Sequence, residues 1–525
     1  MNAITSEPDS QQGHATSGKA WAVFLGLTSL LTIYRLWAVD HSGMSLFFDE
    51  SQYWDWSRHM AWGYYSKPPM VAAEIWLSTH LFGSGVLGVK TVAMLIYPLT
   101  AVALVGLART LWPGDTGVRI GWTAGGLFLT MPLVGLLGMV VSTDGPLLLC
   151  WTLAAWMLWK AQQQDRPLYW VLCGLAVGLG IMSKYTMAAF AITALVTMWM
   201  VPGPRRGLLR TGPWLAALAA ALVVSPNIWW NIQNDFPTLQ HTADITTKST
   251  RGGGIGPALV FLIGQVAAVG PVAVFGAWWL RRRGTASVQQ HYLLAMSLPL
   301  LVIAVLQALR ADAHVNWAAP ALIGIVLLLA TRLAPTSSDT SGHINNMTTG
   351  RTWLLAALLS NLALTGLIFH AQELAAGRLP ARFDILVRMK GWPQAYAQLA
   401  EIRKQAPYAN LPVLADSRLI LTQTAYHWRQ FEVAPMAWNP NGTRQDHYQL
   451  TNSMPEQLGL SALYITDRRD AEPVLSRFDS SSLLREVQVA TGPDRNITLR
   501  LYVVSGFKGY ARHAPGSDDQ VNEND

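Results

Sequence analysis

Acidic and basic side chains that could serve a group transfer are concentrated in residues 47–69, FFDESQYWDWSRHMAWGYYSKPP. This segment carries the adjacent acids Asp49 and Glu50, and it closes with Tyr65 and Lys67 before two prolines. A carboxylate can accept a proton from an attacking hydroxyl, and a lysine can bind the negative charge that builds on a leaving phosphate. These residue types therefore predict the transfer of a group from a phosphate-linked donor.

Similar side chains recur in later segments: Asp144 in STDGPLLL, Lys184 in SKYT, and His241 and Lys248 after residue 230. We expect all of them at one edge of a membrane. Ionisable groups at membrane depth cost roughly 2.5–3.5 kcal/mol each on insertion scales, so they are usually paired or functional. The alternative for the STDGPLLL motif is a structural one, in which a Ser or Thr hydroxyl caps the following helix.

The composition predicts a polytopic α-helical membrane protein. Of the 525 residues, 51% are hydrophobic and 13% are charged, and the mean hydropathy is positive. The net charge of +7 is modest and its basic residues lie in short loops, which favours membrane orientation over nucleic-acid binding. About eleven apolar runs suit spanning helices, and two of them, 168–182 and 186–201, could instead form one broken helix. The runs lie at 20–39, 86–110, 118–140, 146–161, 168–182, 186–201, 213–230, 257–280, 291–308, 317–333 and 352–371.

The loops and the tail predict the topology. Lys and Arg are concentrated in one set of alternate loops, so the positive-inside rule puts the N-terminus in the cytoplasm. We expect residues 1–19 to form a disordered cytoplasmic tail and residues 20–371 a transmembrane catalytic domain. Strand-like segments such as LPVLADSR, ALYITDR and NITLRLYVV predict a small extracytoplasmic α/β domain over residues 372–510. Residues 511–525 are expected to be disordered.

The first outward loop is expected to contain an amphipathic helix over residues 49–60. Tyr53, Trp56 and Met60 fall on one of its faces, which predicts a helix lying in the membrane interface. Asp49 is at or near the N-terminus of this helix, where the helix dipole favours an ionised carboxylate. The alternative for Asp49 is a role as a helix cap alone.

Four segments, taken in order, resemble a known family. DESQYWDWSRHMAWGYYSKPP, STDGPLLL, SKYT and SPNIWWNIQNDF are similar to segments of bacterial GT-C membrane glycosyltransferases, which are related to protein O-mannosyltransferases and to the lipid A aminoarabinose transferase. The resemblance covers roughly residues 20–330 and is most specific in the first segment. It implies a GT-C-like fold with outward amphipathic helices and a periplasmic outer domain, in a bacterial cytoplasmic membrane. It also implies an inverting transfer of a sugar from a polyprenyl-phosphate donor.

The resemblance assigns roles to the acids. Asp49 is similar to the essential acid of the first loop, as base or metal ligand, with Glu50 as a further catalytic candidate. Asp144 is similar to the second acid. His241 resembles a later-loop ligand for phosphate or for a divalent metal. The aminoarabinose transferase has an acid directly before its Lys-Pro-Pro lysine, whereas this chain has Ser66, which puts metal binding at that place in doubt.

The substrate-binding candidates are mostly basic. Lys67 resembles the lysine that holds the donor phosphate, and Lys248 resembles a later-loop donor to phosphate. We further expect Lys184 and Tyr65 to contact the substrate.

These expectations lead to a glycosyltransferase that uses a polyprenyl-phosphate sugar and an acceptor that is lipid A, a polysaccharide or a protein. Membrane lipids are expected partners and nucleic acid is not. The alternatives are a transporter or flippase for a lipid-linked sugar and an envelope scaffold. Transporters usually show internal repeats and polar groups at mid-membrane depth, whereas this chain shows ionisable groups at one edge.

Overall fold

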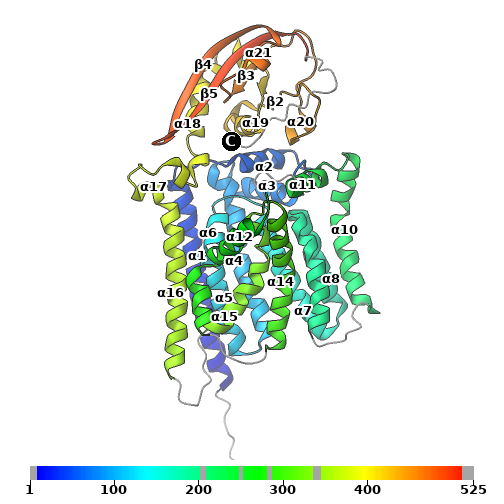
Figure 1. Ribbon diagram of the computed structural model, residues 1–525, viewed down its shortest axis with the longest axis vertical. Helices are drawn as coiled ribbons and strands as arrows, with labels where there is room; N and C mark the ends of the chain where they lie inside the picture. The colour runs from blue at the N-terminus through cyan, green and yellow to red at the C-terminus, as the bar shows by residue number, and fades with distance from the viewer. Residues whose placement is uncertain (1–8, 202–208, 248–251, 281–285, 335–343, 511–525) are drawn as a thin grey trace, which may run out of the picture. The chain divides into compact units, whose positions relative to one another are not determined.

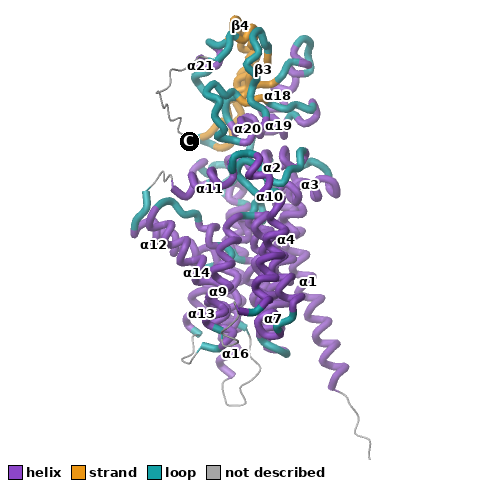
Figure 2. Tube along the Cα trace, turned by 90° about the vertical axis from the view of Figure 1, so that its right-hand side faces the viewer, coloured by secondary structure: helices purple, strands orange, loops and turns teal. Residues whose placement is uncertain are grey.

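A computed structural model describes residues 9–201, 209–247, 252–280, 286–334 and 344–510. The chain divides into two compact units. The first, called here the helical unit, comprises residues 1–42 and 67–369, and the second, called the α/β unit, comprises residues 43–66 and 370–525. The strands all belong to the α/β unit, as Figure 2 shows in orange.

The helical unit is built from helices of different lengths joined by short connections (Figure 1). Its α-helices are α1 (Asp9–His41), α3 (Met70–Phe82), α4 (Val86–Leu111), α5 (Asp115–Thr130), α6 (Pro132–Leu137), α7 (Asp144–Gln164), α8 (Pro167–Ser183), α9 (Phe190–Met200), α10 (Thr211–Gln233), α11 (Pro237–Thr247), α12 (Ile255–Val269), α13 (Pro271–Trp279), α14 (Val288–Arg310), α15 (Ala321–Leu333) and α16 (Ile344–Phe369). The short 3-10 helices η1 (Tyr185–Ala189) and η3 (Val315–Ala318) complete the part that matters for the site.

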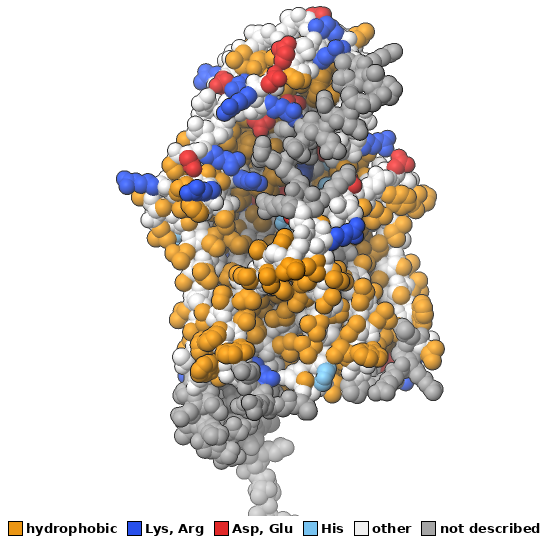
Figure 3. Space-filling model, in the orientation of Figure 1, with side chains coloured by type: hydrophobic (Ala, Val, Ile, Leu, Met, Phe, Trp, Pro, Cys, Tyr) orange, Lys and Arg blue, Asp and Glu red, His pale blue; other side chains and the backbone are white. Residues whose placement is uncertain are grey.

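Several of these helices suit a bilayer. Within the described residues, five are long and apolar enough to cross it, and the bent pair α12 and α13 could add a sixth. Large hydrophobic side chains such as Leu306 of α14 and Leu359 of α16 are exposed, and Figure 3 shows such side chains covering the visible face of this unit. A surface of this kind indicates contact with lipid. The predicted total of about eleven spans stays a prediction.

Two predicted spans are interrupted. The run 118–140 forms α5 and α6, which are separated at Met131 before Pro132, a residue that supplies no N–H to continue the first helix. The run 257–280 forms α12 and α13, which meet at 87° around Gly270. Gly270 has φ of +112°, which only glycine adopts without strain. Residues 168–201, predicted as two runs or as one broken helix, form separate helices on either side of Lys184, which is extended, with φ −156° and ψ 131°.

The α/β unit contains α2 (Phe48–Arg58) and a five-stranded sheet of order β2-β1-β3-β5-β4. β1 pairs in parallel with β2 and β3, whereas β3, β5 and β4 pair antiparallel. The strands are β1 (Val413–Ala415), β2 (Met436–Ala437), β3 (Ala462–Thr466), β4 (Phe478–Gly492) and β5 (Arg495–Phe507). The other helices are α17 (Ala371–Leu374), α18 (Trp392–Arg403), α19 (Arg418–His427), α20 (His447–Thr451) and α21 (Glu472–Leu475).

Alternating residues of the sheet build two cores. Val413 and Leu463 pack on one face with Leu399 of α18 and Leu421 of α19. Leu414, Tyr464 and Phe507 pack on the other face with Val474 of α21. This period of two is what a sheet with helices on it requires, and it fixes the register of each strand.

The division into units differs from the predicted domains in one respect. The predicted boundary near residue 371 is close to the observed one, but residues 43–66 belong to the α/β unit instead of the transmembrane domain. In addition, α1 begins at Asp9, within the tail predicted to be disordered. Extending a formed helix adds one hydrogen bond per residue, so polar residues can prolong it. Residues 1–8 and 511–525 lie outside the described residues.

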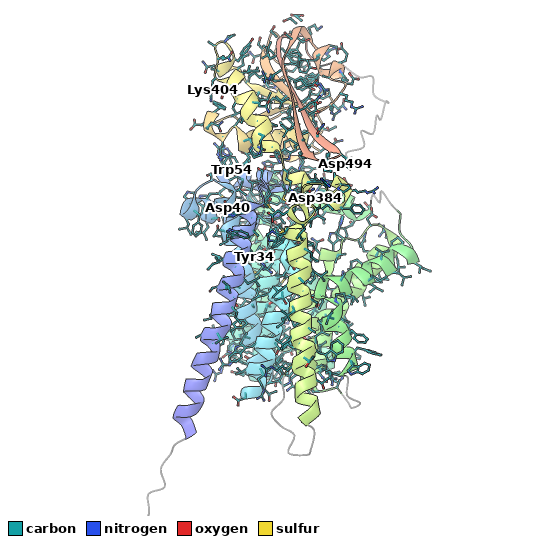
Figure 4. The ribbon with its side chains drawn as sticks, turned by 90° about the vertical axis from the view of Figure 1, so that its left-hand side faces the viewer. Tyr34, Asp40, Trp54, Asp384, Lys404 and Asp494 are labelled. Carbon is teal, nitrogen blue, oxygen red and sulfur yellow. The ribbon has the colours of Figure 1, made fainter. Side chains whose placement is uncertain are left out.

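α2 is not the surface helix that was predicted. Gln52, Tyr53, Trp54 and Trp56 are all buried, so it has no broad polar face. It packs on α19, where the ring of Trp54, labelled in Figure 4, meets Tyr426 edge to face at 5.2 Å. The aromatic side chains are buried because α19, which is far away in the sequence, covers a face of the helix, whereas the predicted position at the membrane interface stays a prediction.

Candidate catalytic site

Asp49 lies in the first turn of α2 and forms an ion pair with Arg418, the first residue of α19. Arg418 Nη2 donates a hydrogen bond to Asp49 Oδ1, and Arg418 Nε donates to Gln52 Oε1 at 2.7 Å. The guanidinium carbon lies 5.0 Å from the centroid of the Phe48 ring. The Asp49 and Arg418 side chains remain 34% and 27% exposed, so other molecules can reach them.

Asp49 is not a helix cap. The N-cap of α2 is Phe47, and its backbone N–H donates to Glu50 Oε2 at 2.8 Å. Glu50 is buried, and its carboxylate therefore satisfies a free donor at the start of the helix. The two adjacent acids thus have different environments, in which Glu50 stabilises α2 and Asp49 faces Arg418.

The charge of Arg418 is favoured by its surroundings. Burial lowers the pKa of Arg418, but Asp49, Tyr53 and Asp446 together more than offset this effect, so the pKa of Arg418 lies above its ordinary value. A guanidinium that stays charged can hold a carboxylate in a fixed direction through its planar set of donors.

Further contacts fix α2 within the α/β unit. Tyr448 of α20 donates a hydrogen bond to Asp55 Oδ2 at 2.9 Å, and burial raises the pKa of Asp55. The Trp56 ring stacks on Tyr64 at 4.4 Å, and both rings meet His447 edge to face. Burial lowers the pKa of His447 to about 4. α2 is therefore held by Tyr448 and His447 of α20 and by Tyr64 in the segment that follows it.

Asp144 is the centre of a polar cluster in the helical unit. It is the first residue of α7, and it is 2% exposed. Lys184 Nζ donates to its Oδ1 at 2.7 Å, and Asn316 Nδ2 donates to its Oδ2 at 2.8 Å. Both carboxylate oxygens are thus engaged, as a buried carboxylate requires.

The break between α8 and η1 makes this pairing possible. Lys184 follows the last residue of α8 and is extended, and its side chain is 18% exposed. Ser142 Oγ accepts a hydrogen bond from Asp144 N at 3.3 Å, so the capping interpretation describes Ser142 but does not explain the Asp144 side chain. Thr143, the N-cap residue of α7, makes no side-chain cap.

The other predicted site residues are distributed over both units. Tyr65 and Lys67 are half-buried and lie between α2 and α3. His241 is half-buried in α11 of the helical unit, whereas Asp49 belongs to the α/β unit. Lys248 lies outside the described residues. The roles predicted for these residues stay predictions.

The predicted divalent metal would need several hard ligands close together. Within the part of the chain that the structure describes, no group of three or more His, Cys, Asp or Glu side chains could hold one. One oxygen of Asp49 accepts from a guanidinium, and Ser66 stands where the aminoarabinose transferase has an acid. The divalent metal predicted at Asp49 and His241 stays a prediction, and no chemical step is derived through one.

Two residues of these clusters were missed from the sequence. Arg418 is the last residue of the predicted strand segment LPVLADSR and the first residue of α19, shortly after the carboxyl end of parallel strand β1. Residues at such strand ends commonly contact ligands in α/β sheets, so this position was a usable signal. Asn316 is in RADAHVNW, where nothing in the sequence distinguishes it from its neighbours as the partner of Asp144.

Comparison with known sequences gives partial and full-length matches. Residues 66–230 match the family model of dolichyl-phosphate-mannose-protein mannosyltransferases. A lipid A galacturonosyltransferase, RgtD of Rhizobium johnstonii, is 28% identical over 90% of this chain and 96% of its own length. An undecaprenyl phosphate-α-4-amino-4-deoxy-L-arabinose arabinosyl transferase of Erwinia tasmaniensis is 31% identical, over 31% of this chain and 30% of its own length.

Comparison with solved structures shows the fold. ArnT of Cupriavidus metallidurans, in its structure bound to undecaprenyl phosphate, aligns with a TM-score of 0.59 and 17% identity over 92% of this chain and 98% of that chain. Its apo structure aligns with a TM-score of 0.61, over 94% of this chain and 98% of that one. The predicted resemblance to the GT-C membrane glycosyltransferases is thereby confirmed.

Proposed function

We propose that this chain, a membrane glycosyltransferase with the ArnT-like GT-C fold, transfers a sugar from a polyprenyl-phosphate donor to lipid A. The observation that carries the proposal is the likeness to a lipid A galacturonosyltransferase over 96% of that relative's length. The fold shared with ArnT supports a polyprenyl-phosphate donor, because ArnT has been solved with undecaprenyl phosphate bound. Protein or polysaccharide acceptors have less support.

A galacturonosyl donor is the first sugar to test. The galacturonosyltransferase aligns over almost its whole length, whereas the aminoarabinose transferase of Erwinia tasmaniensis aligns over 30% of its length. Residues from many loops set sugar specificity, so a relative that aligns over almost its whole length is the better guide to the donor sugar.

The proposed reaction gives a role to each of the two acids. Asp49 accepts the proton of the acceptor hydroxyl, the hydroxyl oxygen forms a bond to the anomeric carbon, and the bond from that carbon to the donor phosphate breaks. Attack opposite the leaving phosphate inverts the anomeric centre. The negative charge that remains on polyprenyl phosphate requires cations, for which Lys67 and Lys184 are the candidates. Asp144 holds Lys184 in position through its Oδ1.

The membrane topology is part of the proposal. The distribution of Lys and Arg among the loops supports a cytoplasmic N-terminus. The α/β unit, which carries Asp49, is then periplasmic and works at the outer face of the bacterial cytoplasmic membrane.

Lipid A from a deletion strain tests the function. Mass spectrometry should show the loss of one sugar from lipid A, and the wild-type gene should restore it. The Asp49→Asn variant at matched expression should not restore it, whereas Glu401→Gln should, because Glu401 is an exposed residue of α18 whose ion pair is with the exposed Lys404. A lipid A composition that is unchanged by the deletion would contradict the proposal.

The transporter alternative makes a different prediction. A flippase would move the lipid-linked sugar without cleaving it, so purified protein in detergent would release no polyprenyl phosphate from the donor. A scaffold would leave Asp49→Asn without effect. The likeness to named glycosyltransferases favours the enzyme over both.

A further inference from the structure

The contact between Asp49 and Arg418 joins segments that are 369 positions apart in the chain. Arg418 lies in the C-terminal domain, which here means residues 370–525 of the α/β unit, at the junction where β1 ends and α19 begins. Ser417 caps this helix, and its hydroxyl accepts from Ile420 N, which fixes where the helix starts. The position of the guanidinium is therefore determined by the β1–α19 connection.

The geometry around the pair is directional. Arg418 holds one oxygen of Asp49, Oδ1, while Gln52 holds Arg418 Nε and the Phe48 ring lies against the guanidinium plane. Within the described residues, no hydrogen bond to Asp49 Oδ2 is present. One oxygen is thus anchored, and the other can accept a proton.

We propose that Arg418 is a positioning residue for Asp49, so that the C-terminal domain takes a direct part in the reaction. This inference rests on the proposed function, in which Asp49 is the base. A carboxylate held by a single fixed contact presents its second oxygen in one direction, which raises the fraction of encounters in which the acceptor proton is within reach. Without the guanidinium, the carboxylate rotates about its side-chain bonds.

Three substitutions separate this role from a purely structural one. Arg418→Met removes the donors, and it should lower kcat about 10- to 100-fold while the KM for the donor stays within about twofold, because a positioning contact acts on the reacting geometry and not on donor binding. Arg418→Lys keeps the charge but lacks the planar set of donors, so its kcat should lie between those of Arg418→Met and wild type. Arg485→Met on β4 removes an exposed arginine of the same unit and should behave as wild type.

The assay uses the full-length purified protein with a polyprenyl-phosphate galacturonic acid donor and lipid A, together with thermal unfolding of each variant. To guard against misfolding, Arg418→Ala is assayed with and without added guanidinium ion at millimolar concentration. Recovery of kcat by guanidinium supports the positioning role, since a small cation can occupy the vacated site but cannot repair a misfolded domain.

Two results would overturn the inference. One is an Arg418→Met enzyme with wild-type kcat, and the other is a variant that loses activity only in proportion to folded protein and is not rescued by guanidinium. A wild-type enzyme that transfers sugar while Arg418→Met is equally active refutes the inference alone. A wild-type enzyme that transfers nothing with either galacturonosyl or aminoarabinosyl donors refutes the proposed function itself.

Discussion

At the scale of single residues, the hydrogen bonds of Asp49 and Asp144 indicate different chemical roles. Asp49 has one oxygen anchored by Arg418 and keeps a third of its side chain exposed. Asp144 has both oxygens engaged and is almost fully buried. A base must have a free oxygen within reach of a proton, so Asp49 suits this role and Asp144 suits the positioning of a cation.

The cluster around Asp144 predicts an asymmetric response to substitution. Lys184→Met leaves a buried carboxylate without its cation, which should destabilise the protein by about 3–5 kcal/mol. Asp144→Asn keeps an oxygen for Asn316 or Lys184 and should cost less. Thermal unfolding of the purified variants, with Lys404→Met as an exposed lysine control, measures both effects. A Lys184→Met protein as stable as wild type would contradict the cluster.

Glu50 gives a second prediction at this scale. Its carboxylate accepts the backbone N–H of Phe47, and the side-chain carbonyl of a glutamine can do the same. Glu50→Gln should therefore keep kcat within about threefold of wild type, whereas Glu50→Ala should lose about 1 kcal/mol of stability. A loss of kcat in Glu50→Gln as large as in Asp49→Asn would instead make Glu50 a catalytic residue.

At the scale of elements, α2 is the feature that sequence patterns described least well. Its helical character was predictable from residues 49–60, and its observed range is Phe48–Arg58. Its partner was not predictable, because α19 follows more than 350 residues later and no local pattern encodes that contact. The apolar runs were predicted from the sequence, but the breaks at Met131 and Gly270 were not. A run of apolar residues has the same hydrophobic pattern whether the helix continues or is broken.

The α/β unit should respond to pH through His427, the last residue of α19. Burial and the neighbouring Arg429 lower the pKa of His427 to about 3, whereas an unfolded histidine titrates near 6.5. As the pH falls, the unfolded chain therefore binds the proton first. The contribution of neutral His427 to the free energy of unfolding is complete above pH 6.5 and is lost as the pH falls toward 3. For one titrating group, the free energy of unfolding changes by at most about 1.4 kcal/mol per pH unit.

Comparing wild type with His427→Gln isolates this contribution, because the buried acids of the unit titrate in both proteins. Wild type should lose stability relative to His427→Gln between pH 6.5 and 4, as measured by hydrogen exchange in peptides of α18 and α19 in the full-length protein. Parallel pH profiles for the two proteins would show that His427 is not held neutral by the fold.

At the scale of the whole molecule, the proposed topology can be tested directly. With a cytoplasmic N-terminus and an odd number of spans, a cysteine introduced at exposed Arg485 of β4 should react with a membrane-impermeant maleimide added to intact spheroplasts. The buried native residues Cys150 and Cys173 should not react. Labelling of the Arg485→Cys variant only after lysis would place the α/β unit in the cytoplasm and contradict the proposal.

The most direct test of the account is the rate of sugar transfer by purified enzyme with and without the Asp49 carboxylate. Wild type, Asp49→Asn and the control Glu401→Gln are assayed with a polyprenyl-phosphate galacturonic acid donor and lipid A, and released polyprenyl phosphate is counted against glycosylated lipid A. The account predicts equal amounts of the two products for wild type and Glu401→Gln, and a loss of at least about 1,000-fold in kcat for Asp49→Asn with folding unchanged. An Asp49→Asn enzyme within about tenfold of wild type would contradict the claim that this carboxylate is the base.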